Sequence, residues 1–200
     1  MARHGETTQN SEKRLSGNSN VAKLTKIGKE HSKKLEGVFN NYKIEAIFSS
    51  PLDRTMETAT PLAESLNLEI CPVEELREFD FGTLDGEKEH GEAEESLFKR
   101  RKDIDFKFPK GESYNDVLQR VTTFLEELQE QSHKMVFIQG HGGVNRCILS
   151  ALTKANPKDI DTISTPNSVV YEIDTETGTC WWKDTLTNET GEGLLFRTGI

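Results

Sequence analysis

Histidine is the side chain of this sequence best suited to chemistry near neutral pH, and two of the five histidines stand apart by their neighbours. An imidazole that gains and loses a proton near neutrality can act as a nucleophile or exchange protons with a ligand. His4 and His141 are each followed by glycine, which lets the backbone approach a ligand closely and leaves room for incoming groups. His31, on the apolar stripe of an expected helix, and His90 and His133, among polar residues, fit ordinary core or surface imidazoles.

The elements expected around these two histidines alternate between strands and helices. Met135 to Ile138 is a short continuous apolar run, typical of a strand buried on both faces, and it ends at the glycines around His141. We predict further strands at residues 44–48, 68–73, 168–173 and 179–184, and helices at residues 24–38, 53–66, 117–128 and 144–152. Pro61 is expected to kink or interrupt the second of these helices. The alternation predicts an α/β sandwich with a mainly parallel sheet, in which ligands bind beyond the carboxyl ends of the strands.

Six blocks of sequence occur in the order found in one protein family. They are Arg3-His4-Gly5-Glu6-Thr7, Asn10 with Arg14-Leu15-Ser16-Gly17, Ser49-Ser50-Pro51-Leu52-Asp53-Arg54-Thr55, Leu76-Arg77-Glu78-Phe79-Asp80-Phe81-Gly82, Gly111-Glu112-Ser113 and Gly140-His141-Gly142-Gly143. In these blocks the chain resembles the histidine phosphatase superfamily, also called phosphoglycerate-mutase-like. The resemblance implies a three-layer α/β/α sandwich and a single domain over residues 1–200, with a charged helical lid segment at about residues 86–110.

The resemblance also assigns roles to the reactive side chains. It implies that His4 attacks phosphorus to form a phosphohistidine, which water then hydrolyses. It places His141 on the opposite side of the phosphate, where the ring hydrogen-bonds the transferring oxygens. Arg3 and Arg54 suit a site without metal, because a guanidinium can donate two hydrogen bonds to adjacent oxygens of a group that carries nearly two negative charges. These cations disfavour imidazolium and so help to keep His4 in its reactive neutral form.

Glu78 is the expected proton donor to the leaving alkoxide. A general acid must be held protonated near neutrality, which burial or nearby carboxylates can achieve. Glu78 could instead be one of several carboxylates in an acidic loop, and its place in Leu-x-Glu-x-x-x-Gly favours the catalytic role. The resemblance further implies that four residues help to bind the substrate: Asn10, Ser16, Gly17 and Gly142.

The blocks favour hydrolysis over phosphoryl transfer to a second hydroxyl group. Mutases of the family usually carry Glu-Arg-x-Tyr-Gly where this chain has Glu78 to Gly82, and they have a longer insertion before the Gly-Glu-Ser block. A mutase must also keep its phosphoenzyme away from water, which favours a closed pocket. We therefore expect a metal-independent phosphomonoesterase that hydrolyses a small phosphorylated metabolite, with mutase-type transfer as the alternative. Lys102, Lys107 and Lys110 could add positive charge at the pocket rim or be merely solvated.

The strand before Arg3 departs from the family pattern. The family has four to six apolar residues there, whereas only Met1 and Ala2 precede Arg3, so the first strand is expected to be truncated. Either the chain is a shortened version of a longer product, or a shortened sheet still holds His4. Catalytic groups need placement within about half an ångström. A catalytically impaired phosphate-binding protein on the same fold is therefore the second alternative.

The composition argues against several other classes of protein. Lys and Arg number 25 against 34 Asp and Glu, and the net charge of −9 disfavours binding to nucleic acid or to an anionic membrane. The sequence contains no apolar run near the roughly 20 residues that cross a bilayer, and Met1 to His4 do not resemble a signal peptide. Cys71, Cys147 and Cys180 form neither a disulfide framework nor a zinc motif, which favours a reducing cytoplasm. We expect no metal or cofactor, and a small anionic phosphorylated substrate as the partner of a monomer or homodimer.

Overall fold

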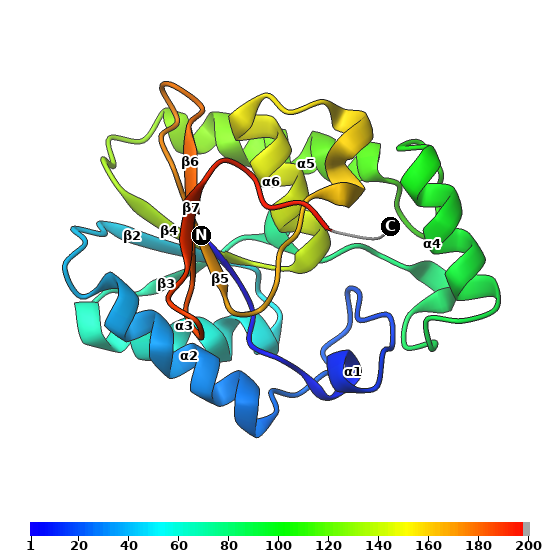
Figure 1. Cartoon of the computed structure of the whole chain (residues 1–200), viewed down its shortest axis with the longest axis horizontal. Helices are drawn as coiled ribbons and strands as arrows, with labels where there is room; N and C mark the ends of the chain where they lie inside the picture. Colours follow the sequence, from blue (N-terminus) through cyan, green and yellow to red (C-terminus); the bar gives the residue numbers. More distant parts are fainter. Residues whose placement is uncertain (198–200) are drawn as a thin grey trace.

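A seven-stranded sheet with helices on both sides organises residues 1–197, which the computed structural model describes (Figure 1). The strands are β1 (Ala2–Arg3), β2 (Ala46–Ser49), β3 (Ile70–Pro72), β4 (Val136–Gly140), β5 (Val169–Ile173), β6 (Cys180–Asp184) and β7 (Thr190–Glu192). Their order across the sheet is β3-β2-β4-β1-β5-β6-β7. Strands β1 to β4 are parallel to one another, β5 and β7 run opposite to them, and β6 runs with them. The predicted α/β architecture with a mainly parallel sheet is confirmed.

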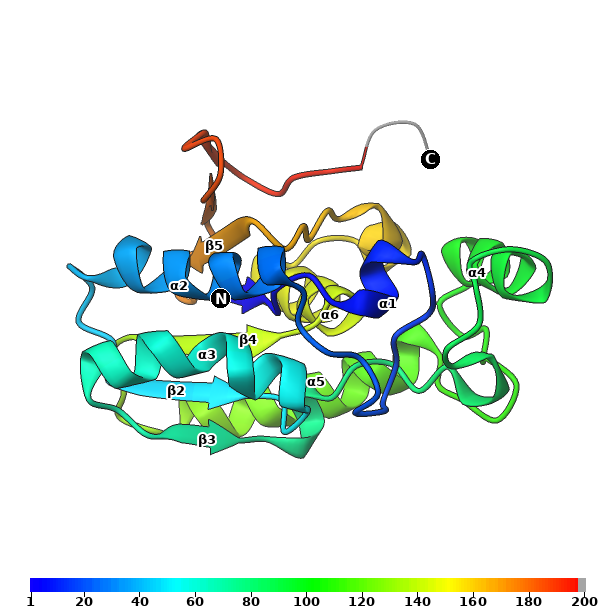
Figure 2. The same ribbon diagram turned by 90° about the horizontal axis from the view of Figure 1, so that it is seen from below.

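The helices form a layer on each face of this sheet, as Figure 2 shows. Helices α2 (Lys26–Phe39) and α3 (Asp53–Leu66) lie on one face, and α5 (Tyr114–Gln129) and α6 (Gly142–Thr153) lie on the other. Two more helices, α1 (Thr8–Ser11) and α4 (Glu92–Lys102), lie on the side to which β2, β3 and β4 point. Three short 3-10 helices occur in the connections: η1 (Glu74–Leu76), η2 (Gly82–Leu84) and η3 (Pro157–Thr162).

Alternating side chains of the central strands fill two separate hydrophobic cores. Ile47 of β2 and Phe137 of β4 point into the core shared with α2 and α3. The next residue of each strand, Phe48 and Ile138, points into the larger core shared with α5 and α6. This alternation is the pleat of a strand that is buried on both faces, and it explains the continuous apolar runs in the sequence.

Helix α3 runs through Pro61 without interruption, so the predicted restart at this residue is wrong, and the predicted kink stays a prediction. A proline lacks the N–H that would bond the carbonyl group four residues earlier, which here belongs to Glu57. The hydroxyl of Ser32 on α2 donates to that carbonyl at 3.4 Å and to the carbonyl of Thr58 at 2.8 Å. The hydroxyl of Ser32 thus takes the place of the N–H that Pro61 lacks, and helix α3 continues past the proline.

Strand β1 is as short as the sequence predicts, and it leaves a cavity in the sheet. Ala2 pairs with Gln139 of β4 on one side and with Val170 of β5 on the other. Beyond Met1, a cavity of about 690 Å³ lies between the two strands, lined by residues of both, including Phe137. The amino group of Met1 ends β1 at this cavity and donates to the carbonyl oxygen of Tyr171 at 2.6 Å. Burial lowers the pKa of this amino group to about 5, so its charged form is disfavoured there.

Joining four apolar residues, Val-Ile-Val-Ile, to the nitrogen of Met1 is expected to raise the unfolding temperature. The added segment would continue β1 between β4 and β5, with side chains entering both cores. Each buried aliphatic side chain is worth about 1.5–3 kcal/mol and ordering a residue costs about 1–2 kcal/mol, so the net gain is about 2 kcal/mol, or roughly 4–8 °C. Differential scanning calorimetry measures the change.

The matched control for this variant carries Gly-Ser-Gly-Ser before Met1. It replaces the buried amine by an amide but adds no apolar side chain, so its unfolding temperature is expected to rise much less. Equal unfolding temperatures for the two extended chains would contradict the interpretation that apolar side chains added before Met1 fill this cavity.

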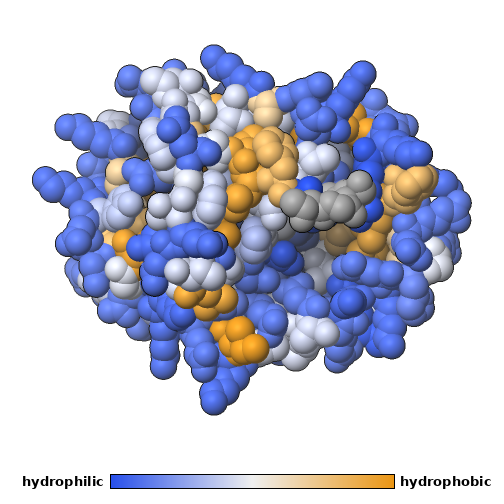
Figure 3. Space-filling view, in the orientation of Figure 1, coloured by the Kyte–Doolittle hydropathy of each residue, from blue (hydrophilic) through white to orange (hydrophobic). Residues whose placement is uncertain are grey.

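The face of the molecule drawn in Figure 3 is mostly hydrophilic, with small separate hydrophobic patches. The large apolar side chains that remain exposed are spread over the chain: Val21, Ile27, Phe98, Trp181, Leu186 and Phe196. Among the helices of residues 1–197, none combines the length and apolar character that a membrane span requires.

Candidate active site

Two neighbouring parallel strands bring the two predicted reactive histidines to the same edge of the sheet. The register pairs Arg3 of β1 with Gly140 of β4, and the N–H of His4 donates to the carbonyl of Gly140 at 3.0 Å. His4 therefore follows β1, while His141 follows β4 and begins α6. Their ring centroids are 5.2 Å apart with an interplanar angle of 62°, and both side chains are buried. The two rings can face one small ligand.

A contact with the adjacent residue fixes the ring of His4. Its Nδ1 lies 2.8 Å from the carbonyl oxygen of Gly5, and a ring nitrogen must carry a proton to donate to a carbonyl. The neutral ring then has its lone pair on Nε2. Burial, helped by the positive charges of Arg54 and Arg3, holds the pKa of His4 well below 6.5. The ring is therefore neutral near pH 7 and offers Nε2 as a nucleophile.

The two predicted arginines lie close to this ring and lack a counter-charge. Arg54 is 1% exposed, and its two terminal nitrogens donate to the carbonyls of Gly17 at 2.7 Å and Ser19 at 2.9 Å. Arg3 donates weakly, at 3.4 Å, to the carbonyl of Thr165. Within residues 1–197 neither arginine forms a salt bridge. Burial lowers the pKa of each to about 10, so both remain charged near neutrality.

Buried hydrogen-bonding groups around the two histidines lack partners. In the part of the chain that the structure describes, neither ring nitrogen of His141 has one, and the Nε atoms of Arg3 and Arg54 have none either. Burial, followed by the charges of Arg54, His4 and Arg3, holds the pKa of His141 well below 6.5. An unsatisfied buried polar group costs about 1–3 kcal/mol. A ligand with several anionic oxygens would accept hydrogen bonds from the two guanidinium groups and from the protonated ring nitrogen of His141, and it would compensate the two guanidinium charges.

The carboxylate of Glu78 is held by the first turn of α6. Its Oε1 accepts from the backbone N–H of Phe79 at 3.0 Å and of Val144 at 3.2 Å, and its Oε2 accepts from Gly143 at 3.0 Å. A side chain at position 143 would collide with this carboxylate, because a Cβ there would lie 2.7 Å from Oε1. Of the two surroundings considered from the sequence, burial and nearby carboxylates, the structure shows burial, and the immediate partners of Glu78 are backbone N–H donors, two of them from the first turn of α6.

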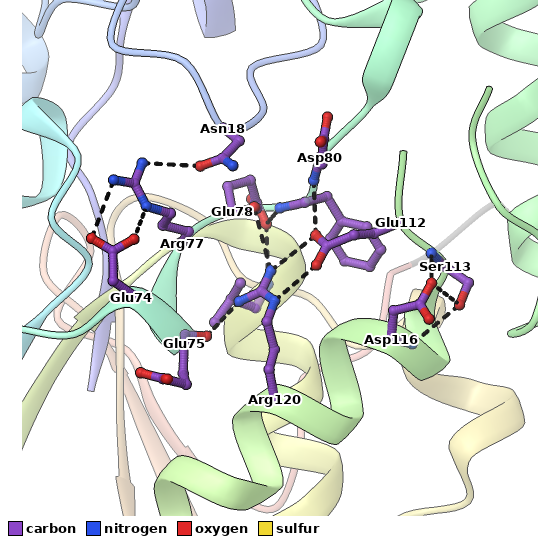
Figure 4. Close-up of polar contacts among 12 residues, drawn as sticks. Asn18, Glu74, Glu75, Arg77, Glu78, Asp80, Glu112, Ser113, Asp116 and Arg120 are labelled. Carbon is purple, nitrogen blue, oxygen red and sulfur yellow. Dashed lines mark hydrogen bonds and ion pairs between the residues drawn. The ribbon is translucent and has the colours of Figure 1, made fainter. Parts of the chain in front are cut away.

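Arg120 of α5 braces the loop that carries Glu78, as Figure 4 shows. Its guanidinium donates to both carboxylate oxygens of Glu112, at 3.0 and 3.2 Å. It also donates to the carbonyl of Glu75 and lies 3.4 Å from the carbonyl of Glu78. Glu112 in turn accepts from the N–H of Asp80 at 2.9 Å. Arg120 is a positioning residue that sequence reasoning missed, and the position of Glu112 in the Gly-Glu-Ser block was the available signal.

The two predicted binding glycines lie beside the arginines. Gly142 lies beside Arg3, and a Cβ there would be in ordinary van der Waals contact with the guanidinium carbon at 3.4 Å. Gly17 accepts from Arg54 through its carbonyl, and its own N–H donates to Asp85 at 2.7 Å. The structure therefore places both glycines at the site, in contact with the two arginines.

A cleft of about 170 Å³ opens beside His4. Six of the predicted site residues line it: Arg3, His4, Asn10, Ser16, Glu78 and Gly142. The hydroxyl oxygen of Ser16 is buried and has no partner within residues 1–197, whereas Asn10 caps α1 by accepting the N–H of Thr7 at 3.1 Å. Arg54 and His141 do not line the cleft, although the ring of His141 lies beside that of His4, which does. Gly17 is linked to the site through Arg54.

Arginines, rather than the suggested lysines, add positive charge to this cleft. Its lining includes five arginines that sequence reasoning did not assign to the site: Arg14, Arg100, Arg101, Arg146 and Arg197. Lys107 instead pairs with Asp116 at 3.0 Å. Two of these arginines come from α4, which lies inside the predicted lid segment, and the lid role itself stays a prediction. The adjacent residues Arg100 and Arg101 were the signal in the sequence that pointed to positive charge at this cleft.

The unfolding free energy is expected to fall as the pH is lowered through 6.5. His4 and His141 bind a proton well below pH 6.5 in the folded chain and near 6.5 when unfolded. The unfolded state therefore binds more protons below pH 6.5, and each ring contributes about 1.4 kcal/mol of lost stability per pH unit until its folded-state pKa is reached. Urea unfolding at pH 7.5, 6.5 and 5.5 in a phosphate-free buffer measures the slope.

The variant His141→Gln is expected to reduce the slope of the unfolding free energy against pH by the contribution of one proton, about 1.4 kcal/mol per pH unit. This change in slope is expected whatever the effect of the variant on overall stability. His133→Gln changes a partly exposed ring and serves as the matched control. A slope that is the same in His141→Gln and in the unaltered chain would contradict the buried, neutral state of His141.

The chain is similar to several known proteins. A phosphatase assigned as phosphoserine phosphatase 2 of Hydrogenobacter thermophilus is 27% identical over 180 residues, covering 88% of both chains. A protein assigned as phosphoglycerate mutase GpmB of Escherichia coli is 31% identical over 160 residues, covering 76% of this chain and 73% of its own. The solved structure of mycobacterial glucosyl-3-phosphoglycerate phosphatase with VO3 has the same fold, with a TM-score of 0.77 at 22% identity over 96% of this chain and 94% of its own. The family model for the histidine phosphatase superfamily (branch 1) matches residues 1–188, and the chain therefore belongs to that superfamily.

Proposed function

We propose that this protein is a phosphomonoesterase that hydrolyses a small phosphorylated metabolite through a phosphohistidine at His4. The observation that carries the proposal is the set of buried donors without partners around a neutral histidine. Within residues 1–197 the Nε atoms of Arg3 and Arg54 and both ring nitrogens of His141 have no hydrogen-bond partner, and a ligand with several oxygens can accept from those that carry a proton. The contact of Nδ1 of His4 with the carbonyl of Gly5 leaves the lone pair of the neutral ring on Nε2. A phosphoryl group is such a ligand.

The first step forms a bond between Nε2 of His4 and phosphorus while the bond from phosphorus to the ester oxygen breaks. The positive charges of Arg3 and Arg54 and the ring of His141 balance the negative charge that spreads over the phosphoryl oxygens. Nδ1 keeps its proton and donates it in a hydrogen bond to the carbonyl oxygen of Gly5. This hydrogen bond stabilises the positive charge that develops on the ring. In the second step water attacks phosphorus and the bond to Nε2 breaks.

Glu78 supplies the proton for the leaving oxygen in this proposal. In the absence of substrate its carboxylate accepts three backbone N–H groups. Glu78 lines the same cleft as Arg3 and His4, so its carboxyl group, when it carries a proton, lies in the space that a bound phosphate ester would occupy. The acid then donates this proton to the leaving alkoxide, and the resulting carboxylate can accept a proton from the attacking water.

Turnover of p-nitrophenyl phosphate is expected to persist in an excess of EDTA. The charge compensation proposed here comes from side chains, and within residues 1–197 no group of three or more His, Cys, Asp and Glu side chains is placed to hold a metal ion. Release of inorganic phosphate with and without chelator measures this. Loss of turnover with EDTA that zinc or magnesium restores would contradict the proposal. Phosphate binding without any turnover would instead favour the impaired binding protein.

Phosphoryl transfer between hydroxyl groups is the second candidate, because one relative is assigned as a phosphoglycerate mutase. The two functions differ in which molecule attacks the phosphohistidine. Interconversion of 2- and 3-phosphoglycerate faster than release of inorganic phosphate from either would favour the mutase. Release of phosphate as the main product from several monoesters would favour the phosphatase.

A further inference from the structure

The bridging segment, residues 165–167, joins η3 to β5 and lies outside the six sequence blocks. Because β5 runs antiparallel to β1, the residues just before β5 lie beside the end of β1, where the reactive histidines are. Thr165 is 5% exposed, and its hydroxyl donates to the carbonyl of Gly142, directly after His141, at 3.1 Å. The bridging segment is thus tied to the first turn of α6.

Asn167 ties the other end of the bridging segment to His4. Its side-chain nitrogen donates to the carbonyl oxygen of His4 at 2.6 Å. A carboxamide donates only through its nitrogen, so this partner fixes the orientation of the amide. Through Thr165 and Asn167, one short segment connects the backbone at His4 with the backbone after His141.

The peptide group between His4 and Gly5 is held at both ends. Its carbonyl accepts from Asn167, and its N–H donates to the hydroxyl of Thr58 on α3 at 2.9 Å. A side chain at position 5 is excluded, because a Cβ there would lie 2.3 Å from the carbonyl oxygen of Gly28 on α2. Contacts from α2, α3 and the bridging segment therefore restrict the peptide group that follows the reactive ring.

This peptide group also determines where the ring of His4 points. The next carbonyl along the chain, that of Gly5, lies 2.8 Å from Nδ1 and fixes both the ring and its tautomer. A rotation of the His4–Gly5 peptide group would move the carbonyl of Gly5 and, with it, Nε2 of His4. Without the donor of Asn167, the carbonyl of His4 would lose its side-chain partner, which favours such a rotation toward another donor.

We propose that Asn167 and Thr165 are positioning residues that hold the His4–Gly5 peptide group and the first turn of α6 at a fixed separation, so that the two histidines face one phosphoryl group. The inference rests on the proposed function and adds to it two residues that act through the backbone rather than on the substrate. Strand β1 has only two residues, and the bridging segment supports the reactive end of this short strand.

Replacing Asn167 with leucine removes the donor at similar size and is expected to lower kcat for p-nitrophenyl phosphate about tenfold or more, with KM changed less than about twofold. A displacement of a reacting group by about 1 Å can cost 10²-fold in rate, whereas Arg3 and Arg54 still bind the phosphoryl group. Thr165→Val, which removes only the hydroxyl, is expected to lower kcat in the same way. Thr165→Ser keeps the hydroxyl and is expected to retain the kcat of the unaltered chain.

The matched control is Thr162→Val, because the hydroxyl of Thr162 donates within η3, to the carbonyl of Asp159 at 2.6 Å. Its kcat is expected to stay unchanged. An unaltered kcat in Asn167→Leu, a higher KM in place of a lower kcat, or an equal fall of kcat in Thr162→Val would overturn the inference. Calorimetric unfolding checks that each variant folds, and Asn167→Ser takes the place of Asn167→Leu if the leucine variant does not.

The tautomer of His4 gives a readout that does not depend on turnover. Two-dimensional 1H–15N spectra of the histidine rings are expected to show His4 neutral with its proton on Nδ1, and His4→Gln identifies the signal. In Asn167→Leu this signal is expected to shift toward a mixture of the two tautomers, whereas Thr162→Val leaves it in place. An unchanged tautomer in Asn167→Leu would overturn the inference. A shifted tautomer in a protein that hydrolyses no phosphate ester would support the inference and refute the proposed function instead.

Discussion

Replacing His4 with glutamine is expected to lower kcat/KM for p-nitrophenyl phosphate by about 10³-fold or more. Glutamine can keep a polar contact near the carbonyl of Gly5, but it has no nucleophilic nitrogen to bond phosphorus. The acid-labile phosphoenzyme is expected to disappear together with turnover. Steady-state release of phosphate and alkali-quenched labelling with 32P-labelled substrate measure the two effects in the same preparation.

The control for this variant is His133→Gln, which changes a partly exposed ring outside the cleft. Its turnover and labelling are expected to match those of the unaltered chain. A His4→Gln protein that still takes label from the substrate would show that another residue forms the covalent bond. Calorimetric unfolding of both variants separates loss of the nucleophile from loss of the fold.

Replacing Glu78 with glutamine is expected to slow hydrolysis of alkyl phosphates by about 10²–10⁴-fold, and hydrolysis of p-nitrophenyl phosphate much less. An alkoxide is a poor leaving group that needs a proton as the ester bond breaks, whereas nitrophenolate leaves without one. A plot of log kcat/KM against the pKa of the leaving alcohol measures the difference. Its slope is expected to be steeper in the variant than in the unaltered chain.

The hydrogen bonds of Glu78 make a second variant necessary. A glutamine amide would face the N–H of Gly143, which now donates to the carboxylate, so Glu78→Gln could also disturb the first turn of α6. Arg120→Gln loosens the loop without removing the carboxyl group and serves as the comparison. It is expected to lower rates for both leaving groups alike. Equal losses on alkyl and nitrophenyl esters in Glu78→Gln would contradict its role as an acid.

Much of the fold could be predicted because its signals are local. The apolar run at Met135 to Ile138 became β4, and residues 53–66 form α3 with the expected bounds. Ser113 and Asp116 form the capping box that their spacing indicates. The continuation of α3 through Pro61 could not be predicted, because it depends on a hydroxyl from a different helix.

In the candidate site, too, features with local sequence signals could be predicted, and features that depend on distant segments could not. His4 and His141 could be paired from sequence because each follows a strand, and neighbouring parallel strands end at one edge of the sheet. The donors that hold Glu78 could not be foreseen, since they come from α6, more than sixty residues later in the chain. Arg197 lies still further away and reaches the cleft only through the folded chain. Sequence motifs therefore predicted which groups react, while the charge balance around them required the structure.

The central claim is that Nε2 of His4 bonds to phosphorus, and the most direct test is to find that bond. The protein is mixed with a 32P-labelled substrate, quenched in alkali within milliseconds, digested, and the labelled peptide analysed by mass spectrometry and by chromatography against standards of the two phosphohistidine isomers. The account predicts one labelled residue, His4, with the phosphoryl group on Nε2, because Nδ1 is held by the carbonyl of Gly5. Label on any other residue, or on Nδ1 of His4, would contradict it.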